Sequence, residues 1–130
     1  MTARAITTAG APQAIGAYSQ AIDTGSLVFV AGQIGLDPGT REIVEGGVEE
    51  QADRALRNIR AILDAAGLSM SDVVKTTILL TDIADFEVVN AIYARYVSDP
   101  PPARATYAVA ALPRGARVEI EAIAARPSAV

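Results

Sequence analysis

Residues 48–66, VEEQADRALRNIRAILDAA, are the stretch that decides the fold. Apolar side chains recur there every three or four residues, which places them on one face of an α-helix. Gly67 follows directly and suits the position just after a helix ends. An apolar helix face needs a partner layer, so the rest of the chain has to supply one. The residues that form this face are Val48, Ala52, Ala55, Leu56, Ile59, Ile62, Leu63 and Ala66.

Outside this helix the pattern is typical of strands and turns. A second helix is predicted from an N-cap at Asp82 to about Val97. Thr24-Gly25-Ser26 joins two strands as a hairpin, and the turn Pro113-Arg114-Gly115 makes the last two strands an antiparallel pair. The sequence therefore predicts an α+β fold, in which a mixed sheet of about six strands packs two helices on one face. The predicted strands are residues 3–8, 18–23, 27–31, 73–81, 105–112 and 117–125.

Two helices cover only one face of such a sheet. The strands at 27–31, 73–80 and 105–112 are nevertheless apolar on both faces. A sheet face without helices still has to be buried, and a further copy of the chain is the simplest cover. We therefore expect an oligomer.

Length and composition set limits on function. The chain has 130 residues, of which 51% are apolar and 20% charged, as expected for a single domain over residues 1–130. The net charge of −4 argues against bulk nucleic-acid binding. No apolar run approaches the roughly 20 residues that span a bilayer, and the first residues lack the apolar core of a signal peptide. We therefore expect a cytoplasmic protein without a membrane partner.

The sequence contains neither Cys nor His. This composition excludes thiol catalysis, Cys/His zinc sites and Ser-His or Cys-His dyads. Any chemistry has to use carboxylates, Lys, Arg, Tyr, hydroxyl groups, the backbone or water.

Arg104 is the strongest candidate for a binding residue. It follows three prolines, residues 100–102, which restrict the backbone and so hold the next residues rigidly in one position. Its planar guanidinium matches a carboxylate. Glu119 and Glu121 lie two apart on the last predicted strand, so both point to the same face. One interpretation is a structural salt-bridge cluster with Arg104 and Arg117; the other is an acid that handles a proton beside an anion-binding arginine.

Three further residues are candidate site residues, and each also has an ordinary structural explanation. Asn90 falls on the apolar side of the second predicted helix, where it either ties the helix to the sheet or enters a site. Tyr18 sits at a junction between a loop and a strand, where aromatic residues often belong to the core or its rim. Gly32 permits a close approach of the backbone.

Several motifs occur along the chain in a characteristic order. They are AIGAYSQA at 14–21, VAGQI at 30–34, VKTT at 74–77, PAR at 102–104 and VEIEAIA at 118–124, together with Asn58 and Asn90. This ordered set resembles the RidA family of reactive-intermediate deaminases, also called YjgF/YER057c/UK114. The resemblance covers nearly the whole chain.

The resemblance implies a fold, an assembly and an activity. The fold would be the chorismate-mutase-like homotrimer, with sheets inside, helices outside and clefts between neighbouring subunits. The family hydrolyses small imino and enamino acids, such as 2-aminoacrylate and 2-iminopropanoate, to 2-oxo acids and ammonia. It requires no cofactor and no metal.

The resemblance also implies roles for individual residues. Arg104 would bind the substrate carboxylate, and Glu119 would position or activate water. The substrate-binding positions would be Tyr18, Ala31, Gly32, Asn90, Ala105 and Thr106. Many members have Ser in place of Ala31 and Cys in place of Thr106, and the segment 96–104 is several residues shorter here.

Two alternative functions are considered: one would use the same residues, and the other is associated with the same family. A non-catalytic, ligand-binding or regulatory trimer would use the Arg104 cleft without turnover. A ribonuclease or inhibitor of translation, a label often attached to the family, is disfavoured by the acidic net charge and the lack of His.

Overall fold

The computed structural model describes residues 2–127, and its six strands form one mixed sheet in the order β1-β2-β3-β6-β4-β5. All pairs are antiparallel except β4 with β5, which is parallel. The predicted α+β architecture is confirmed. The elements are β1 (Arg4–Ile6), β2 (Ala21–Asp23), β3 (Leu27–Ile34), α1 (Val48–Ala65), β4 (Val73–Leu80), α2 (Phe86–Tyr93), β5 (Ala103–Ala108) and β6 (Val118–Ala125).

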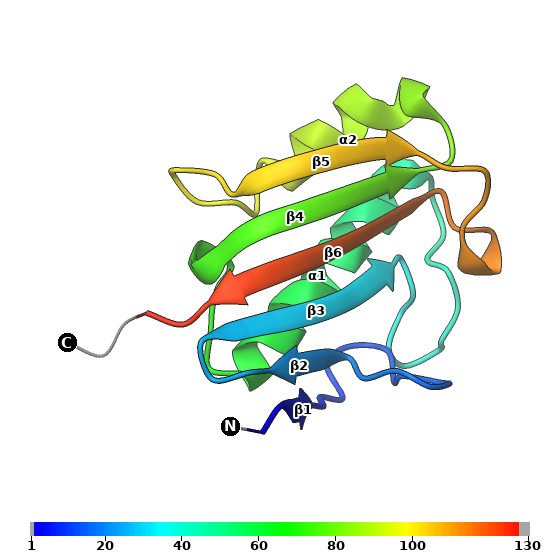
Figure 1. Cartoon of the computed structure of the whole chain (residues 1–130). Coiled ribbons are helices and arrows are strands. Elements are labelled where there is room, and N and C mark those ends of the chain that lie inside the picture. The colour runs from blue at the N-terminus through cyan, green and yellow to red at the C-terminus, as the bar shows by residue number, and fades with distance from the viewer. Residues whose placement is uncertain (1, 128–130) are drawn as a thin grey trace.

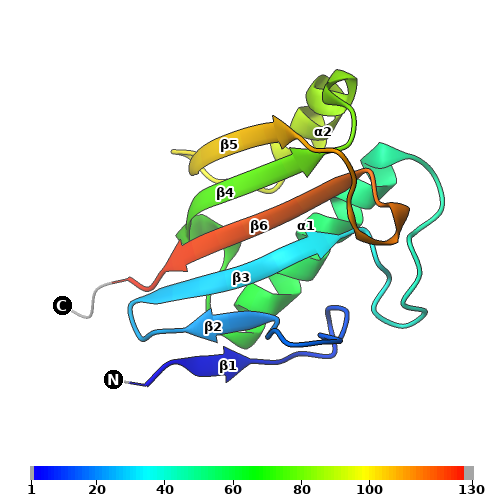
Figure 2. The ribbon, with the colours of Figure 1, turned by 45° about the vertical axis from the view of Figure 1, so that its right-hand side comes forward.

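Both helices lie on the same face of the sheet, and among the described residues the opposite face carries none (Figure 1). Helix α1 runs behind β3 and β6, and α2 lies beside it behind β4 and β5 (Figure 2). The apolar face predicted for residues 48–66 is the buried face of α1. Gly67 follows the helix with φ +76°, a conformation that glycine adopts without strain. Within residues 2–127, neither helix is long and apolar enough to cross a membrane.

The second helix is shorter than predicted. Asp82 does act as a cap, because its side chain accepts a hydrogen bond from the Ala84 N–H at 2.9 Å. It caps a short 3-10 turn at Ile83–Asp85, however, and α2 begins only at Phe86 and ends at Tyr93.

The predicted pairing of the last two strands is wrong. Strand β6 lies between β3 and β4, and β5 pairs with the far side of β4 instead. The turn at Pro113–Gly115 belongs to a connection over residues 109–117 that passes from the edge of the sheet to its centre. Every second side chain of β6 is buried under the helices, whereas β5 has exposed side chains at both ends. The central position therefore goes to the strand with more apolar surface to bury.

A bulge interrupts the pairing of β3 with β6. Val30 lies opposite Ala122 and Gln33 opposite Ile120, so β3 has one residue more than β6 in this interval. The bulge falls on Ala31 and Gly32. Bulges re-aim side chains beside functional sites, and this one lies next to Glu119, which pairs with Ile34.

Candidate functional site

Arg104 is held against helix α2 by three neighbours. Its Nη1 donates to the Asn90 Oδ1 at 2.6 Å. Its guanidinium carbon lies 5.4 Å from the ring centre of Phe86 and 5.1 Å from that of Tyr93. Tyr93 is fixed in turn, because its buried hydroxyl shares a 2.7 Å hydrogen bond with the Thr76 hydroxyl. Stacking and a single hydrogen bond leave other guanidinium donors available for an anion.

Thr106 and Ala105 follow Arg104 on β5 and face opposite ways. Strand alternation puts Thr106 on the same side as Arg104, and Ala105 on the side without helices. The Thr106 Oγ1 is buried and has no hydrogen-bond partner among residues 2–127. A buried hydroxyl without a partner is costly, so this oxygen is a position where a ligand or water would be favoured.

Tyr18, Ala31, Gly32 and Glu119 line one cavity of about 590 Å³. They come from the loop before β2, from the bulge of β3 and from the start of β6. The structure thus brings together four of the predicted site residues, of which Tyr18 and Glu119 lie 101 positions apart in the sequence.

Glu119 is half-buried in this cavity and has a raised pKa. Burial is the main cause, and the negative charge of Glu121 on the same face adds to it. Gly32 lies so close that a side-chain carbon at its position would collide with the Glu119 carboxylate, 2.9 Å from Cδ. The absence of a side chain at residue 32 therefore allows the carboxylate to occupy its place.

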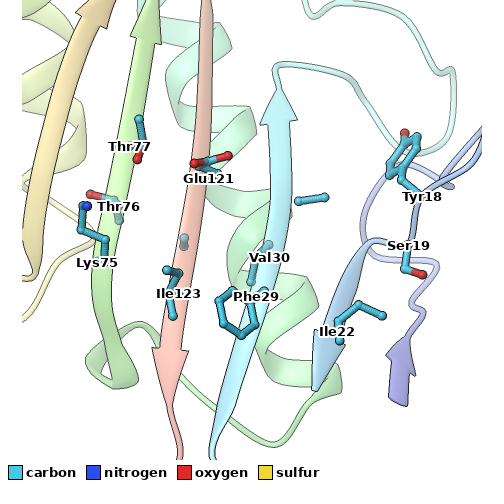
Figure 3. A pocket seen from close by; sticks show the side chains of 12 residues that line it. Tyr18, Ser19, Ile22, Phe29, Val30, Lys75, Thr76, Thr77, Glu121 and Ile123 are labelled. Carbon is cyan, nitrogen blue, oxygen red and sulfur yellow. The ribbon is translucent and has the colours of Figure 1, made fainter. Parts of the chain in front are cut away.

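Glu121 belongs to a neighbouring hollow on the helix-free face of the sheet. Figure 3 shows its side chain on β6 near Thr77 and Lys75 of β4, with Tyr18 on the far side across β3. Phe29 also lines this hollow and is 43% exposed. Exposed apolar side chains beside charged ones are common on surfaces that bind another molecule.

Arg104 and Glu119 do not meet within one chain. Arg104 lies on the helix-covered side, at the edge strand, whereas Glu119 and Glu121 alternate with the buried residues of β6 and face the other side. The predicted salt-bridge cluster is also absent. Between residues 2 and 127 neither acid forms a salt bridge, and Arg117 pairs with Asp85 at 2.9 Å instead.

A family model described as Endoribonuclease L-PSP matches residues 8–126. The chain belongs to this family. A human relative named 2-iminobutanoate/2-iminopropanoate deaminase is 54% identical to this L-PSP chain over 121 residues, which cover 93% of this chain and 88% of the human one. The resemblance to RidA proteins is confirmed as well, since relatives and solved structures carry that name.

Two solved structures share the fold of this L-PSP chain closely. RidA from the Antarctic bacterium Psychrobacter sp. superposes with a TM-score of 0.91 at 48% identity, covering 95% of this chain and 99% of that one. Escherichia coli TdcF with bound serine gives a TM-score of 0.90 at 43% identity, with the same coverage.

Two further groups lie around the cavity of this L-PSP chain: Arg114, which the sequence indicated only as a turn residue, and Asn58, which it indicated only as part of the ordered motifs. Arg114, at φ +62°, also lines it and donates from Nη2 to the Arg41 carbonyl oxygen at 2.7 Å. Asn58 is fully buried in α1 and donates to the carbonyl oxygens of Ile34 and Leu36, which line the cavity. The turn residues around Arg114 and a polar residue on an apolar helix face were the available signals.

The described part of this L-PSP chain contains no group of three or more Asp and Glu side chains arranged to hold a metal ion. The polar groups around Arg104 and around Glu119 are a guanidinium, an amide, hydroxyls and carboxylates. They can bind a carboxylate, orient water and accept a proton.

Proposed function

We propose that the protein hydrolyses 2-imino acids and their enamine tautomers, such as 2-iminopropanoate and 2-aminoacrylate, to 2-oxo acids and ammonia. The proposal rests mainly on Arg104, which stacks on two aromatic rings and is fixed by a hydrogen bond to Asn90. Its other guanidinium N–H groups remain available to bind an anion. A half-buried carboxylate, Glu119, supplies the second group. The name of the human relative supports this reaction class.

The reaction needs little from the protein. Arg104 pairs with the substrate carboxylate through two parallel N–H donors. Water adds to the protonated C=N carbon, and Glu119 accepts the proton that this water loses. Glu119 returns that proton to the nitrogen, which leaves as ammonia while the hydroxyl oxygen forms the C=O bond and releases its proton to solvent. One water is therefore consumed for each imine. An iminium is already electrophilic, so orientation and modest electrostatic help suffice without His or Cys.

Glu119 suits the role of base because its pKa is raised. A carboxylate whose pKa is nearer to the working pH is a better proton acceptor than an ordinary one. The Thr106 hydroxyl and Tyr18 then line the substrate, and the backbone around Ala31 and Gly32 approaches it closely.

The proposal includes a cytoplasmic homotrimer in which each site lies between two subunits. Two observations support an assembly of several copies of the chain. The helix-free face of the sheet exposes Phe29 and Tyr107, which are 43% and 58% exposed. Arg104 and Glu119 lie on opposite faces of one sheet, so one copy of the chain cannot close both around a small acid. A neighbouring copy supplies the missing half.

The test couples a threonine dehydratase, which releases an enamine, to measurement of 2-oxo acid formation. The wild-type protein should accelerate release of the 2-oxo acid, and Arg104→Ala should not. Equal acceleration by both proteins would contradict the assigned site. Binding of a 2-oxo acid without any turnover would favour the ligand-binding alternative.

A further inference from the structure

The Arg104 guanidinium is held only by groups that carry no charge. Its neighbours on helix α2 are the Asn90 amide and the rings of Phe86 and Tyr93. Among residues 2–127 it forms no salt bridge. An acidic neighbour would fix the guanidinium more strongly, but it would also neutralise the charge and compete with a substrate carboxylate. The position of Arg104 therefore depends on three neutral side chains.

These three side chains come from one face of α2. Phe86, Asn90 and Tyr93 are spaced by four and three residues, which brings them together on a helix. Arg104 reaches them from β5, the strand at the edge of the sheet. Phe86 and Asn90 are half-buried, whereas Tyr93 is only 4% exposed. Tyr93 is therefore the neighbour that the protein interior can fix most firmly.

Tyr93 is anchored to the sheet through Thr76. Thr76 is 2% exposed, and its hydroxyl shares a 2.7 Å hydrogen bond with the Tyr93 hydroxyl. Thr76 is also the residue of β4 that lies opposite Arg104 in the register of β4 with β5. Residues that lie opposite each other in neighbouring strands point to the same face of the sheet. The anchor of the Tyr93 ring thus lies directly beside the residue that stacks on this ring.

Stability alone does not require this pair of hydroxyls. A phenylalanine at residue 93 and a valine at residue 76 would fill the same space without any polar group. Replacing both partners of a buried hydrogen bond by apolar groups of the same shape is nearly neutral for stability. What the hydroxyls add is direction, because a hydrogen bond restricts both the distance and the angle between its groups. A small displacement of a group that orients the substrate is costly.

We propose that Tyr93 and Thr76 are positioning residues for Arg104. Their hydrogen bond fixes the ring on which the guanidinium stacks, and so directs the free guanidinium donors toward the substrate carboxylate. This inference rests on the proposed function, since it concerns the carboxylate of the same substrate. Both residues act through Arg104, so loss of their hydrogen bond weakens binding of the carboxylate. The proton transfers at Glu119 are left largely unchanged.

The experiment measures pyruvate binding by isothermal titration calorimetry, kcat and KM for hydrolysis of 2-iminopropanoate, and stability by urea unfolding. Tyr93→Phe and Thr76→Val each remove one hydroxyl and leave the other buried without its partner. The double variant removes both hydroxyls, so neither is left unpaired. Thr76→Ser keeps the hydroxyl. Tyr96→Phe is the matched control, because it removes a tyrosine hydroxyl that donates to Asp53, on a ring that lies against Arg60.

Tyr93→Phe and Thr76→Val should each weaken pyruvate binding and raise KM by about tenfold, the scale of one hydrogen bond. The value of kcat should change by less than about threefold, because an interaction made equally in the ground state and the transition state affects KM alone. The double variant should regain much of the stability that the single variants lose and still bind pyruvate about tenfold more weakly than wild type. Thr76→Ser and Tyr96→Phe should bind pyruvate like the wild type.

Three results would overturn the inference while the proposed function stands. They are pyruvate binding by the double variant as tight as that of wild type, an equal loss of binding in Tyr96→Phe, and a lower kcat with an unchanged KM. The first result would mean that the two hydroxyls support only the fold. If wild type neither binds pyruvate nor hydrolyses 2-iminopropanoate, the proposed function itself fails and the inference with it.

Discussion

Arg104 and Glu119 project from opposite faces of the same six-stranded sheet. Arg104 stacks on Phe86 and Tyr93 on the side that the helices cover. Glu119 points to the side without helices and lines a cavity with Tyr18. One chain therefore presents two half-sites that face away from each other. If both act on one small substrate, a second chain has to bring its own half.

Replacing Arg104 by lysine should cost most of the activity although the charge is kept. Lysine lacks the planar fork and the flat face that stacks on the rings, so it cannot pair with a carboxylate through two parallel bonds. We expect kcat/KM to fall about a hundredfold, measured by imine hydrolysis, because the lost hydrogen bond is charge-assisted. The matched control is Arg95→Lys, which should stay near wild type. Similar losses in the two variants would point to a general effect of arginine replacement.

Gly32→Ala should impair catalysis through Glu119. The new methyl group would occupy the space of the Glu119 carboxylate, so the carboxylate has to move. We expect kcat to fall about tenfold or more with a smaller change in KM, since small displacements of a catalytic group are costly. Gly39→Ala, in an exposed loop and with negative φ, is the control and should retain activity. A variant at residue 32 with wild-type kcat would show that Glu119 has no fixed role.

Glu121→Gln should move the acid limb of the pH–rate profile to lower pH. Glu119 has to be ionised to accept a proton, so activity is lost as pH falls through its raised pKa. The charge of Glu121 is the second cause of that rise, after burial. Removing it lowers the pKa of Glu119 part of the way to its usual value. The measurement is kcat/KM against pH for both proteins; a limb that stays in place or moves upward would contradict this assignment.

Asn58→Ala should destabilise the fold. The side chain is fully buried and donates to the carbonyl oxygens of Ile34 and Leu36. The Leu36 oxygen would lose this partner, whereas the Ile34 oxygen also accepts from the Leu36 N–H at 2.8 Å and would keep that bond. One acceptor left unpaired costs on the order of 1–3 kcal/mol, measurable by urea unfolding. Arg54→Ala removes the 3.1 Å bond from Arg54 Nε to the Asn58 Oδ1 and leaves the two carbonyl bonds intact. This control should cost well under half as much; equal costs would mean that Asn58 acts mainly through Arg54.

Much of the fold was predictable because local patterns were strong. The helix at 48–66 was found within one residue, since its apolar spacing and Gly67 agree. The hairpin of β2 with β3 followed from the turn residues. Strand alternation also predicted that Glu119 and Glu121 point to the same face of the sheet. The position of β6 between β3 and β4 could not be predicted from local patterns, because the pairing of distant strands depends on which strand buries most surface.

The arrangement of the site was predictable only in part. The residues themselves were recognised from an ordered set of motifs, and Tyr18, Gly32 and Glu119 do share a cavity. The sequence did not show that Arg104 lies on the face of the sheet opposite to Glu119. It depends on the register of β5 against β4, where Arg104 lies opposite Thr76, and a shift of one residue would have reversed it.

Subunit complementation tests the central claim most directly. Arg104→Ala and Glu119→Gln chains with different affinity tags are co-expressed, and assemblies that carry both tags are purified. In a ring of three with each site between neighbours, every mixed trimer has one site that combines an intact Arg104 with an intact Glu119. We predict that each variant alone is nearly inactive and that mixed trimers recover about a third of the wild-type imine hydrolysis. Mixed assemblies as inactive as the single variants would contradict a site shared between chains.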